Sequence, residues 1–383
     1  MRVGTFVLAG QFPGQRHDEV LHRVVRSAEA AEEAGLDAVW LAEHHFMPYG
    51  VCPSATTLAA YLLGRTRGIG VGTAVSVLST QHPVALGEQA ALLHLTSDGR
   101  FTLGVGRGGP WIDLKVFGTG LAAYEEGFPE SLDLLLRWLR EDEVGADGSR
   151  FRFPAVPVVP RPDTGPEGSG PPVVMACTSP HGVRLAAERG LPMLLGMHAG
   201  DEERAEMVGL WRRTALESGA DPQRVAEAEH VAAGVVQIAD SQSEAVQVLR
   251  RSLPAWLRPG LAAYRTVDGR ERTMRDALAY TELLCELHPV GPPQLCADRL
   301  AATAERTGIR RFALLAEGSG TLDGTEETIR RLGGEVLPLL PDVPAPGAVT
   351  PRTGEGETAP LPAASASGPA GDSISSHAAP VTG

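Results

Sequence analysis

Residues 18–45 read DEVLHRVVRSAEAAEEAGLDAVWLAEHH, and this stretch decides the fold because it holds one complete helix-to-strand unit. Apolar residues recur at steps of three and four along a helix expected over 18–34, namely at Val20, Val24, Ala28 and Ala31. Gly35 is expected to end that helix, and the apolar run 38–42 predicts a buried strand directly after it. A helix with one apolar face needs a sheet to cover, so the unit predicts an α/β protein.

The same alternation of short apolar runs and longer amphipathic stretches continues along the chain, and it is typical of βα units around a parallel sheet. We expect eight strands, over 3–8, 38–42, 69–77, 101–105, 172–176, 192–195, 232–238 and 311–316. Eight parallel strands that alternate with helices predict a single (β/α)8 TIM barrel, and 383 residues are enough for one.

Three segments depart from this rhythm. Residues 147–171 are dense in Pro and Gly, which predicts an insertion on the barrel surface, and the long charged segment 258–288 is expected to be a lid over the active face. Residues 344–383 hold almost no large apolar residue, so they cannot offset the entropy cost of ordering and are expected to be disordered. The predicted barrel domain therefore covers residues 1–343.

Composition narrows the class of ligand. Acidic residues outnumber basic ones by 47 to 34, a net charge of −13, which disfavours nucleic-acid binding because that affinity comes from cationic contacts to phosphates. The four cysteines form no C-x-x-C pair, which favours neither a disulfide framework nor a zinc ribbon. No apolar run approaches the roughly 18 residues of a membrane helix. We expect a cytoplasmic protein with small-molecule ligands.

Reactive residues directly follow predicted strands, at the face where barrel enzymes place their active sites. Glu43-His44-His45 follow the second strand, Gly106-Arg107-Gly108 the fourth and Cys177-Thr178-Ser179 the fifth. Ser179-Pro180 is a favoured helix start, and the free amides there, with Arg107 opposite, would suit a phosphate-bearing cofactor. The alternative is that Ser179 merely caps a helix.

Other interpretations of these motifs carry less weight. Residues 104–109 fit G-x-G-x-x-G, but no helix starts at Gly109, so a dinucleotide fingerprint is excluded. His44 and His45 are adjacent on an extended segment and point in opposite directions, so both rarely bind one ion, and no metal site is predicted. Such a histidine is either a structural hydrogen-bonding residue or a general base.

A series of short motifs occurs in one order along residues 1–342: 42–46 (AEHHF), 62–66 (LLGRT), 71–73 (VGT), 80–84 (TQHPV), 97–101 (SDGRF), 106–108 (GRG), 116–118 (VFG), 289–291 (PVG), 307–309 (TGI) and 336–338 (VLP). Together they resemble the bacterial luciferase-like family of flavin-dependent monooxygenases, to which the luciferase α subunit belongs. The resemblance implies a barrel enzyme that takes reduced FMN (FMNH2) from a separate, transiently bound flavin reductase. It implies that FMNH2 and O2 then insert one oxygen atom into a small organic substrate, such as a secondary metabolite.

The resemblance also implies roles for individual residues. Arg107, Thr178 and Ser179 match positions that hold the FMN phosphate. Ala74-Val75 match a segment under the flavin ring, where relatives often carry a non-proline cis peptide. His44 matches the family's catalytic histidine, and Asp113 matches an acidic position close to the chemistry. The family commonly forms dimers through the helices after the second and third strands, so a dimer is expected.

The sequence departs from the family pattern in two places. Gly106 stands where some luciferases carry a reactive cysteine, so no thiol chemistry is implied, and Pro110-Trp111-Ile112 replaces a more polar run. These departures argue against aldehyde oxidation with light emission. Three alternatives stay open, namely an F420-dependent oxidoreductase, a flavin-binding barrel without turnover and a metal-dependent barrel hydrolase. The Glu-His-His-Phe and Arg-Gly motifs are closer to the FMN branch.

Overall fold

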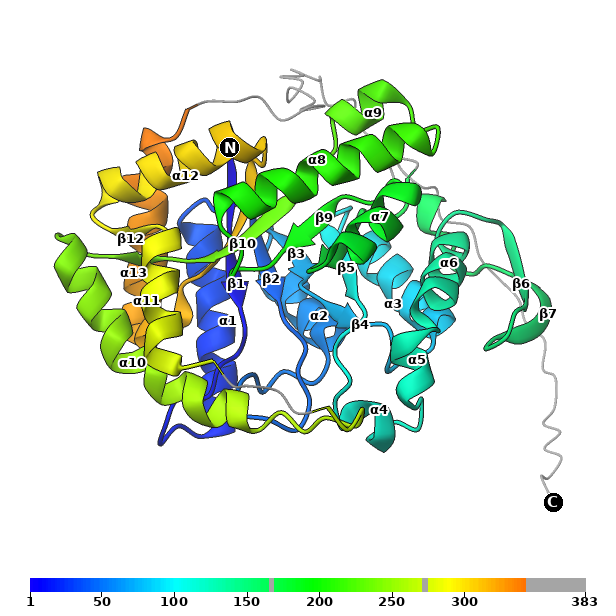
Figure 1. Ribbon diagram of the computed structural model, residues 1–383, viewed down its shortest axis with the longest axis horizontal. Helices are drawn as coiled ribbons and strands as arrows, with labels where there is room; N and C mark the ends of the chain where they lie inside the picture. The colour runs from blue at the N-terminus through cyan, green and yellow to red at the C-terminus, as the bar shows by residue number, and fades with distance from the viewer. Residues whose placement is uncertain (165–168, 271–274, 342–383) are drawn as a thin grey trace, which may run out of the picture. The chain divides into compact units, whose positions relative to one another are not determined.

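The computed structural model describes residues 1–164, 169–270 and 275–341 of the chain. Eight parallel strands form a closed barrel in the order β3-β2-β1-β13-β10-β9-β8-β5, and β5 pairs with β3 to complete the ring (Figure 1). These strands are β1 (Arg2–Val7), β2 (Ala38–Leu41), β3 (Gly70–Thr73), β5 (Phe101–Gly106), β8 (Val173–Cys177), β9 (Met193–Leu195), β10 (Val231–Val235) and β13 (Arg311–Leu315). The predicted TIM barrel is confirmed, with a strand at each of the eight expected places.

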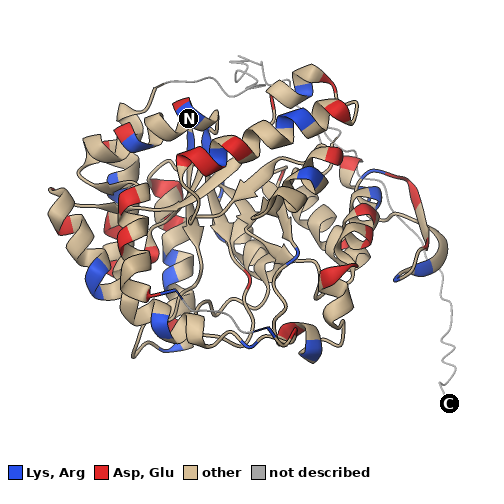
Figure 2. Cartoon of the chain, in the orientation of Figure 1, with Lys and Arg blue, Asp and Glu red and all other residues tan. Residues whose placement is uncertain are grey.

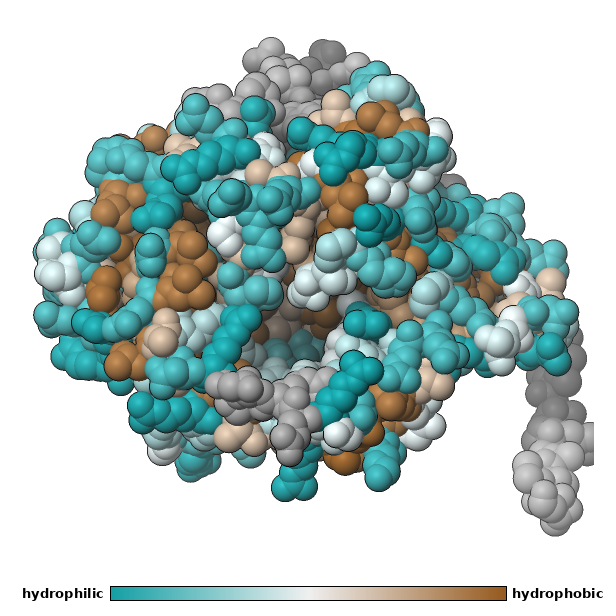
Figure 3. Space-filling model, viewed as in Figure 1, coloured by the Kyte–Doolittle hydropathy of each residue, from teal (hydrophilic) through white to brown (hydrophobic). Residues whose placement is uncertain are grey.

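Helices surround the barrel. The longer ones are α1 (His17–Glu33), α2 (Ala55–Arg65), α3 (Pro83–Thr96), α6 (Phe128–Trp138), α7 (Pro180–Glu188), α8 (Asp201–Glu217), α10 (Gln242–Ala262), α11 (Ala277–Leu287), α12 (Pro293–Thr307) and α13 (Leu322–Arg331), and the short ones are α4 (Asp113–Val116), α5 (Leu121–Glu125) and α9 (Pro222–Ala226). Charged residues lie mainly on the helices and loops, and the strands carry very few (Figure 2). The face of the molecule shown in Figure 3 is accordingly largely hydrophilic, with smaller hydrophobic patches. In the described part of the chain, no helix is both long and apolar enough to cross a membrane.

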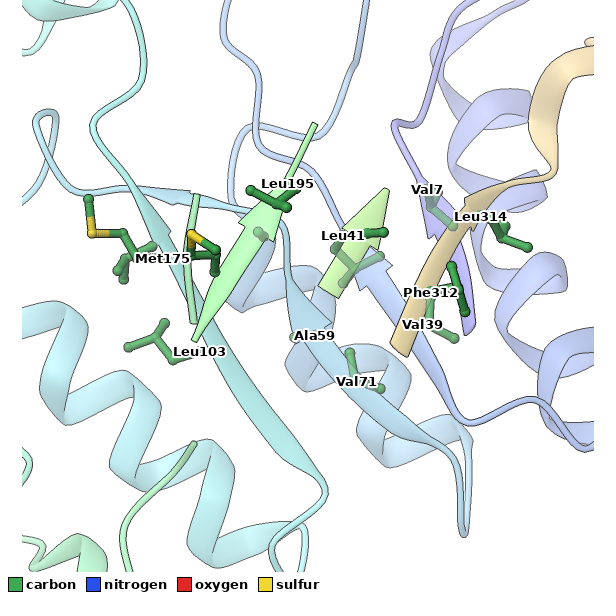
Figure 4. Close-up of a cluster of buried hydrophobic side chains, with 14 of the residues drawn as sticks. Val7, Val39, Leu41, Ala59, Val71, Leu103, Met175, Leu195, Phe312 and Leu314 are labelled. Carbon is green, nitrogen blue, oxygen red and sulfur yellow. The ribbon is translucent and has the colours of Figure 1, made fainter. Parts of the chain in front are cut away.

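Side chains alternate between the two faces of each barrel strand, as the period of a strand requires. In β2, Val39 and Leu41 face the layer between strands and helices (Figure 4), whereas Trp40 belongs to a second cluster with the residues inside the barrel. Trp40 is fully buried, and a Cβ at Gly72 would lie 2.7 Å from its indole ring. Gly72 therefore provides the room that a tryptophan needs inside a narrow barrel.

Two predicted strands are each divided in the structure. The run 69–77 splits into β3 and β4 (Ser76–Val77), interrupted at Ala74-Val75. The run 232–238 splits into β10 and β11 (Gln237–Ile238), and β11 pairs with β12 (Val290–Gly291) outside the barrel. Continuous apolar runs hide such breaks because nearly all residues of both pieces are buried, with Gly70 as the exception.

The expected insertions are more ordered than their composition suggests. Residues 147–171 overlap an antiparallel hairpin of β6 (Glu143–Asp147) and β7 (Arg152–Pro157), which sequence reasoning missed because prolines disfavour strands except at free edges. The segment 258–288 is helical at both ends, since α10 extends to Ala262 and α11 begins at Ala277, while residues 271–274 between them lie outside the described residues. The tail 344–383 lies outside the described residues.

A buried ion pair joins the first and last strands of the barrel. Glu317, just after β13, accepts hydrogen bonds from the amides of Leu8 (2.8 Å) and Ala9 (3.1 Å), just after β1. Arg23 of α1 lies 3.4 Å from the same carboxylate, and both side chains are almost completely buried. Burial raises the pKa of Glu317, whereas Arg23 and the two amides act in the opposite direction. One carboxylate thus ties β1, β13 and α1 together.

We expect Glu317→Gln to lower the free energy of unfolding by about 3–5 kcal/mol, because it leaves the Arg23 guanidinium buried without its counter-charge. Urea denaturation followed by circular dichroism measures this loss. Glu327→Gln is the matched control, since Glu327 forms an ion pair with Arg330 on the exposed face of α13 and should cost less than about 1 kcal/mol. Equal losses in the two variants would contradict a special role for Glu317.

Candidate functional site

The predicted site residues follow strands whose carboxyl ends open on one face of the barrel. His44 follows β2, Val75 lies between β3 and β4, Arg107 follows β5, and Thr178-Ser179 follow β8. Figure 3 shows the molecular surface hollowed at the end of the barrel to which these strands point. The arrangement matches the position of active sites in other barrels.

One pocket of about 240 Å³ brings together Val75, Arg107, Thr178 and Ser179, four of the seven residues predicted from the sequence. Ser179 caps α7, and its Oγ accepts a hydrogen bond from the Gly182 amide at 3.3 Å. The predicted helix start is therefore confirmed. Because the remaining amides of the first turn have no partner within the helix, the positive end of α7 borders the pocket.

Arg107 supplies the cationic side of this pocket. Its guanidinium lies over the ring of Tyr124, with Cζ 4.1 Å from the ring centroid, and Nη2 lies 3.1 Å from the Tyr124 hydroxyl. Among the described residues, no carboxylate forms an ion pair with Arg107. Its charge is thus free to meet an anion, although Glu125 and His181 also line the pocket.

The Ala74-Val75 peptide bond is cis, as the sequence resemblance implied. The Ala74 amide donates to the Leu41 carbonyl at 2.6 Å, which anchors this segment to β2. A Cβ at Gly106 would lie 2.6 Å from Cγ2 of Val75 and 3.4 Å from Cβ of Ala176. The glycine before Arg107 is therefore required by the close approach of Val75.

Glu43 has a structural position. Its carboxylate is buried and accepts hydrogen bonds from the amides of Val77 (3.1 Å) and Ala55 (3.2 Å), the first residue of α2. His45 Nε2 lies 3.6 Å from the same carboxylate. Glu43 thus holds the end of β2 against β4 and the N-terminus of α2, which positions the neighbouring His44.

His44 is a neutral imidazole at pH 7. Burial, and then the nearby His45, lower its pKa to about 4. Its ring packs edge-on against Tyr49 with centroids 5.1 Å apart, and in the described structure Nδ1 is buried without a hydrogen-bond partner. A Cβ at Gly50 would lie 2.7 Å from that nitrogen, so Nδ1 faces the backbone of Gly50.

Asp113 lies close enough to His45 for the two side chains to interact electrostatically. It begins α4, is 6% exposed, and accepts a hydrogen bond from the Leu114 amide at 2.8 Å. Burial raises the pKa of Asp113, and the Leu114 amide and His45 partly offset that effect. Within the described residues, no group of three or more His, Cys, Asp and Glu side chains could hold a metal ion.

Sequence reasoning missed several aromatic and polar residues of this face: Tyr49, Tyr124, His181, Trp256 and Tyr264. His181 stands two residues after the predicted cap, so its place in the first turn of α7 gave a usable signal. Tyr49 and Tyr264 are 215 positions apart in the chain, yet their rings lie 5.9 Å apart. No local pattern could have predicted that contact.

Comparison with known sequences identifies a family for this architecture. The family described as luciferase-like monooxygenase matches residues 1–311. The alkanal monooxygenase alpha chain of the Kryptophanaron alfredi symbiont is 30% identical over 357 residues, which cover 89% of this chain and 98% of that protein. The protein of the same name from Photorhabdus luminescens is 29% identical over a segment of equal length.

Solved structures share the fold at lower identity. Monooxygenase RslO1 from Streptomyces bottropensis superposes with a TM-score of 0.76 at 22% identity, covering 88% of this chain and 99% of that one. The oxygenating constituent of 3,6-diketocamphane monooxygenase from Pseudomonas putida, solved in complex with FMN, gives 0.70 at 20% identity and covers 89% and 98%. An F420-dependent secondary alcohol dehydrogenase gives 0.68 at 18% identity and covers 89% and 99%.

The contact between Gly106 and Val75 can be tested directly. We expect Gly106→Cys to lower the free energy of unfolding by about 1–3 kcal/mol, because its side chain would overlap the Val75 methyl group. Adding Val75→Ala removes that methyl group and should restore part of the loss in urea denaturation. If the double variant is no more stable than Gly106→Cys alone, a steric clash with Val75 is not the reason for the loss.

Proposed function

This chain belongs to the luciferase-like monooxygenase family, and on that basis we propose that it is a flavin-dependent monooxygenase that uses reduced FMN. With O2 as co-substrate, it would insert one oxygen atom into a small organic substrate, such as a secondary metabolite. The observation that carries the proposal is the pocket in which Arg107 meets the N-terminus of α7. A family member with this pocket has the features that a flavin phosphate needs.

The residues of the pocket fit the FMN phosphate. A phosphate is dianionic near neutral pH, and helix N-termini and arginine are its usual partners. Arg107 offers a guanidinium, while Thr178 and Ser179 offer hydroxyls. Val75 lines the same pocket, so a phosphate bound there would place the rest of the cofactor beside the Ala74-Val75 segment. Bound reduced FMN would supply the reducing equivalents for the reaction with O2.

His44 would be the proton-transfer residue in this reaction. Its imidazole is neutral at pH 7, and it would act as an acid or base at Nε2, because Nδ1 is buried against Gly50. Glu43 holds the strand end in place through its backbone contacts. Asp113 would act nearby as a carboxylic group whose pKa is raised by burial. The barrel strands keep these groups in fixed positions.

An F420-dependent oxidoreductase is the second candidate, because a dehydrogenase that uses F420 shares the fold. Anaerobic titration separates the two, since FMNH2 and reduced F420 would compete for one site with different affinities. Tighter binding of F420 would overturn the proposed cofactor. A flavin-binding barrel without turnover would bind FMNH2 but would not alter its reaction with O2.

The proposed partners follow from the family. Reduced FMN would come from a separate flavin reductase that binds transiently in the cytoplasm. We also propose a dimer through α2 and α3, where two large apolar side chains are exposed, Tyr61 at 53% and Leu92 at 55%. A second subunit on these helices would cover both.

We expect Arg107→Ala to weaken FMNH2 binding by about 10- to 100-fold, the loss of one charge-assisted contact, and to change reduced-riboflavin binding by less than about threefold, because riboflavin has no phosphate. Anaerobic fluorescence titration measures both affinities. Arg140→Ala, at an exposed arginine after α6, is the control and should change neither. An equal loss for both flavins would contradict the phosphate assignment.

Rapid mixing of the FMNH2-loaded protein with O2 tests the reaction itself. We expect a transient absorbance that differs from those of reduced and oxidised FMN, and His44→Ala should change its decay rate by at least about tenfold because a proton-transfer group is lost. His22→Ala, on the exposed face of α1, should leave the decay unchanged. Reoxidation identical to that of free FMNH2 would refute a monooxygenase.

A further inference from the structure

A row of aromatic rings crosses the C-terminal face of the barrel, and we call it the aromatic wall: Trp111, Tyr264, Tyr49, Trp256 and Phe12. Neighbouring ring centroids lie 4.5, 5.9, 4.9 and 5.5 Å apart in that order. The rings come from the loops after β1, β2 and β5 and from α10 and the segment after it. Only the folded barrel therefore brings them together.

The backbone makes room for this wall. A Cβ at Gly10 would lie 2.8 Å from the Trp256 indole, and one at Gly109 would lie 2.1 Å from Trp111. On the far side of the face, the Val267 amide donates to the Pro110 carbonyl at 2.8 Å, which ties the segment after α10 to the loop after β5. The wall is a fixed part of the fold.

Part of the wall is exposed to solvent. Phe12 and Trp256 are buried, whereas Trp111, Tyr49 and Tyr264 are half-buried. The edge of His44 meets the Tyr49 ring, so the wall begins at the proposed catalytic histidine. Trp111 is four residues after Arg107, on the loop that leads from the phosphate pocket to Asp113. A molecule held against these rings would lie beside the proposed reaction centre.

The wall also carries hydroxyl groups. Among the described residues, the hydroxyls of Tyr49 and Tyr264 form no hydrogen bond. Burial raises the pKa of both groups, so they stay protonated and can donate. The Arg275 guanidinium lies over the ring of nearby Tyr280, 5.0 Å from its centroid, and adds positive charge on the same side. The surface therefore combines ring faces with donors for an oxygen atom.

We propose that the aromatic wall binds the substrate, and that the substrate is a planar aromatic compound with phenolic or quinone oxygens. This inference rests on the proposed function, because it assigns the substrate class of the same site. A flat ring would stack on Tyr264, and the substrate oxygens would accept hydrogen bonds from Tyr49 and Tyr264. An alkyl chain would remove water from these hydroxyls without replacing the lost hydrogen bonds, which disfavours a long-chain alkanal.

Equilibrium dialysis of the full-length protein, with and without FMN, tests the proposal with 2-naphthol, naphthalene and decanal as probes. We expect 2-naphthol to bind at least about tenfold more tightly than naphthalene or decanal, because it alone offers both a flat ring and an oxygen. Tyr264→Leu removes a stacking ring and should weaken both aromatic probes. Tyr49→Phe with Tyr264→Phe keeps the rings and should abolish only the preference for 2-naphthol over naphthalene.

Phe153→Leu is the matched control, because it changes a half-buried ring on the β6–β7 hairpin, and all three affinities should stay within about twofold. FMN binding, measured on every variant, reports an intact flavin site independently of the wall. If the wild-type protein does not bind FMN but still prefers 2-naphthol, the proposed function is overturned, whereas the aromatic wall remains a ligand-binding surface. Decanal binding as tightly as 2-naphthol, or a preference unchanged in the double variant, would overturn the wall as the substrate surface.

Discussion

The pairing of β1 with β13 is the interaction on which the rest of the structure depends. Five residue pairs run from Arg2 and Arg311 to Phe6 and Leu315, and they join the two ends of the barrel sequence. Glu317 then fixes the carboxyl ends of both strands through two amides and one buried arginine. Without this closure, the sheet would have two open edges. The carboxyl ends of its strands would then not form one continuous rim.

Closure matters because a parallel barrel gathers all its carboxyl ends on one face. Side chains that are hundreds of residues apart become neighbours there. The strand ends are held by backbone contacts to buried polar groups, as at Glu43, and by glycines that permit close approach, as at Gly106. These contacts fix the positions of the strand ends, which would suit groups that hold a cofactor and a proton-transfer residue in register.

The two halves of the rim have different chemistry. The side formed by β5, β8 and α7 offers a cation, hydroxyls and helix amides, which suit a phosphate. The side formed by the loops after β1 and β2, with α10, offers aromatic rings and phenol hydroxyls. His44 contacts the second side and Val75 lines the first, so a flavin anchored by its phosphate would reach toward the aromatic wall. A cofactor and a flat substrate would thus meet near a neutral histidine.

The sequence by itself determined the barrel, because its βα units alternate short apolar strands with amphipathic helices, and glycines follow several of those helices, such as Gly35, Gly190 and Gly308. A local motif also predicted the helix cap at Ser179, and the family resemblance predicted the cis peptide at Ala74-Val75. Only the tertiary structure decided that Glu43 supports the backbone, that Asp113 lies by His45, and that Tyr49 meets Tyr264. The physical reason is that these contacts join segments far apart in the chain. Their geometry exists only after the strands have closed into a ring.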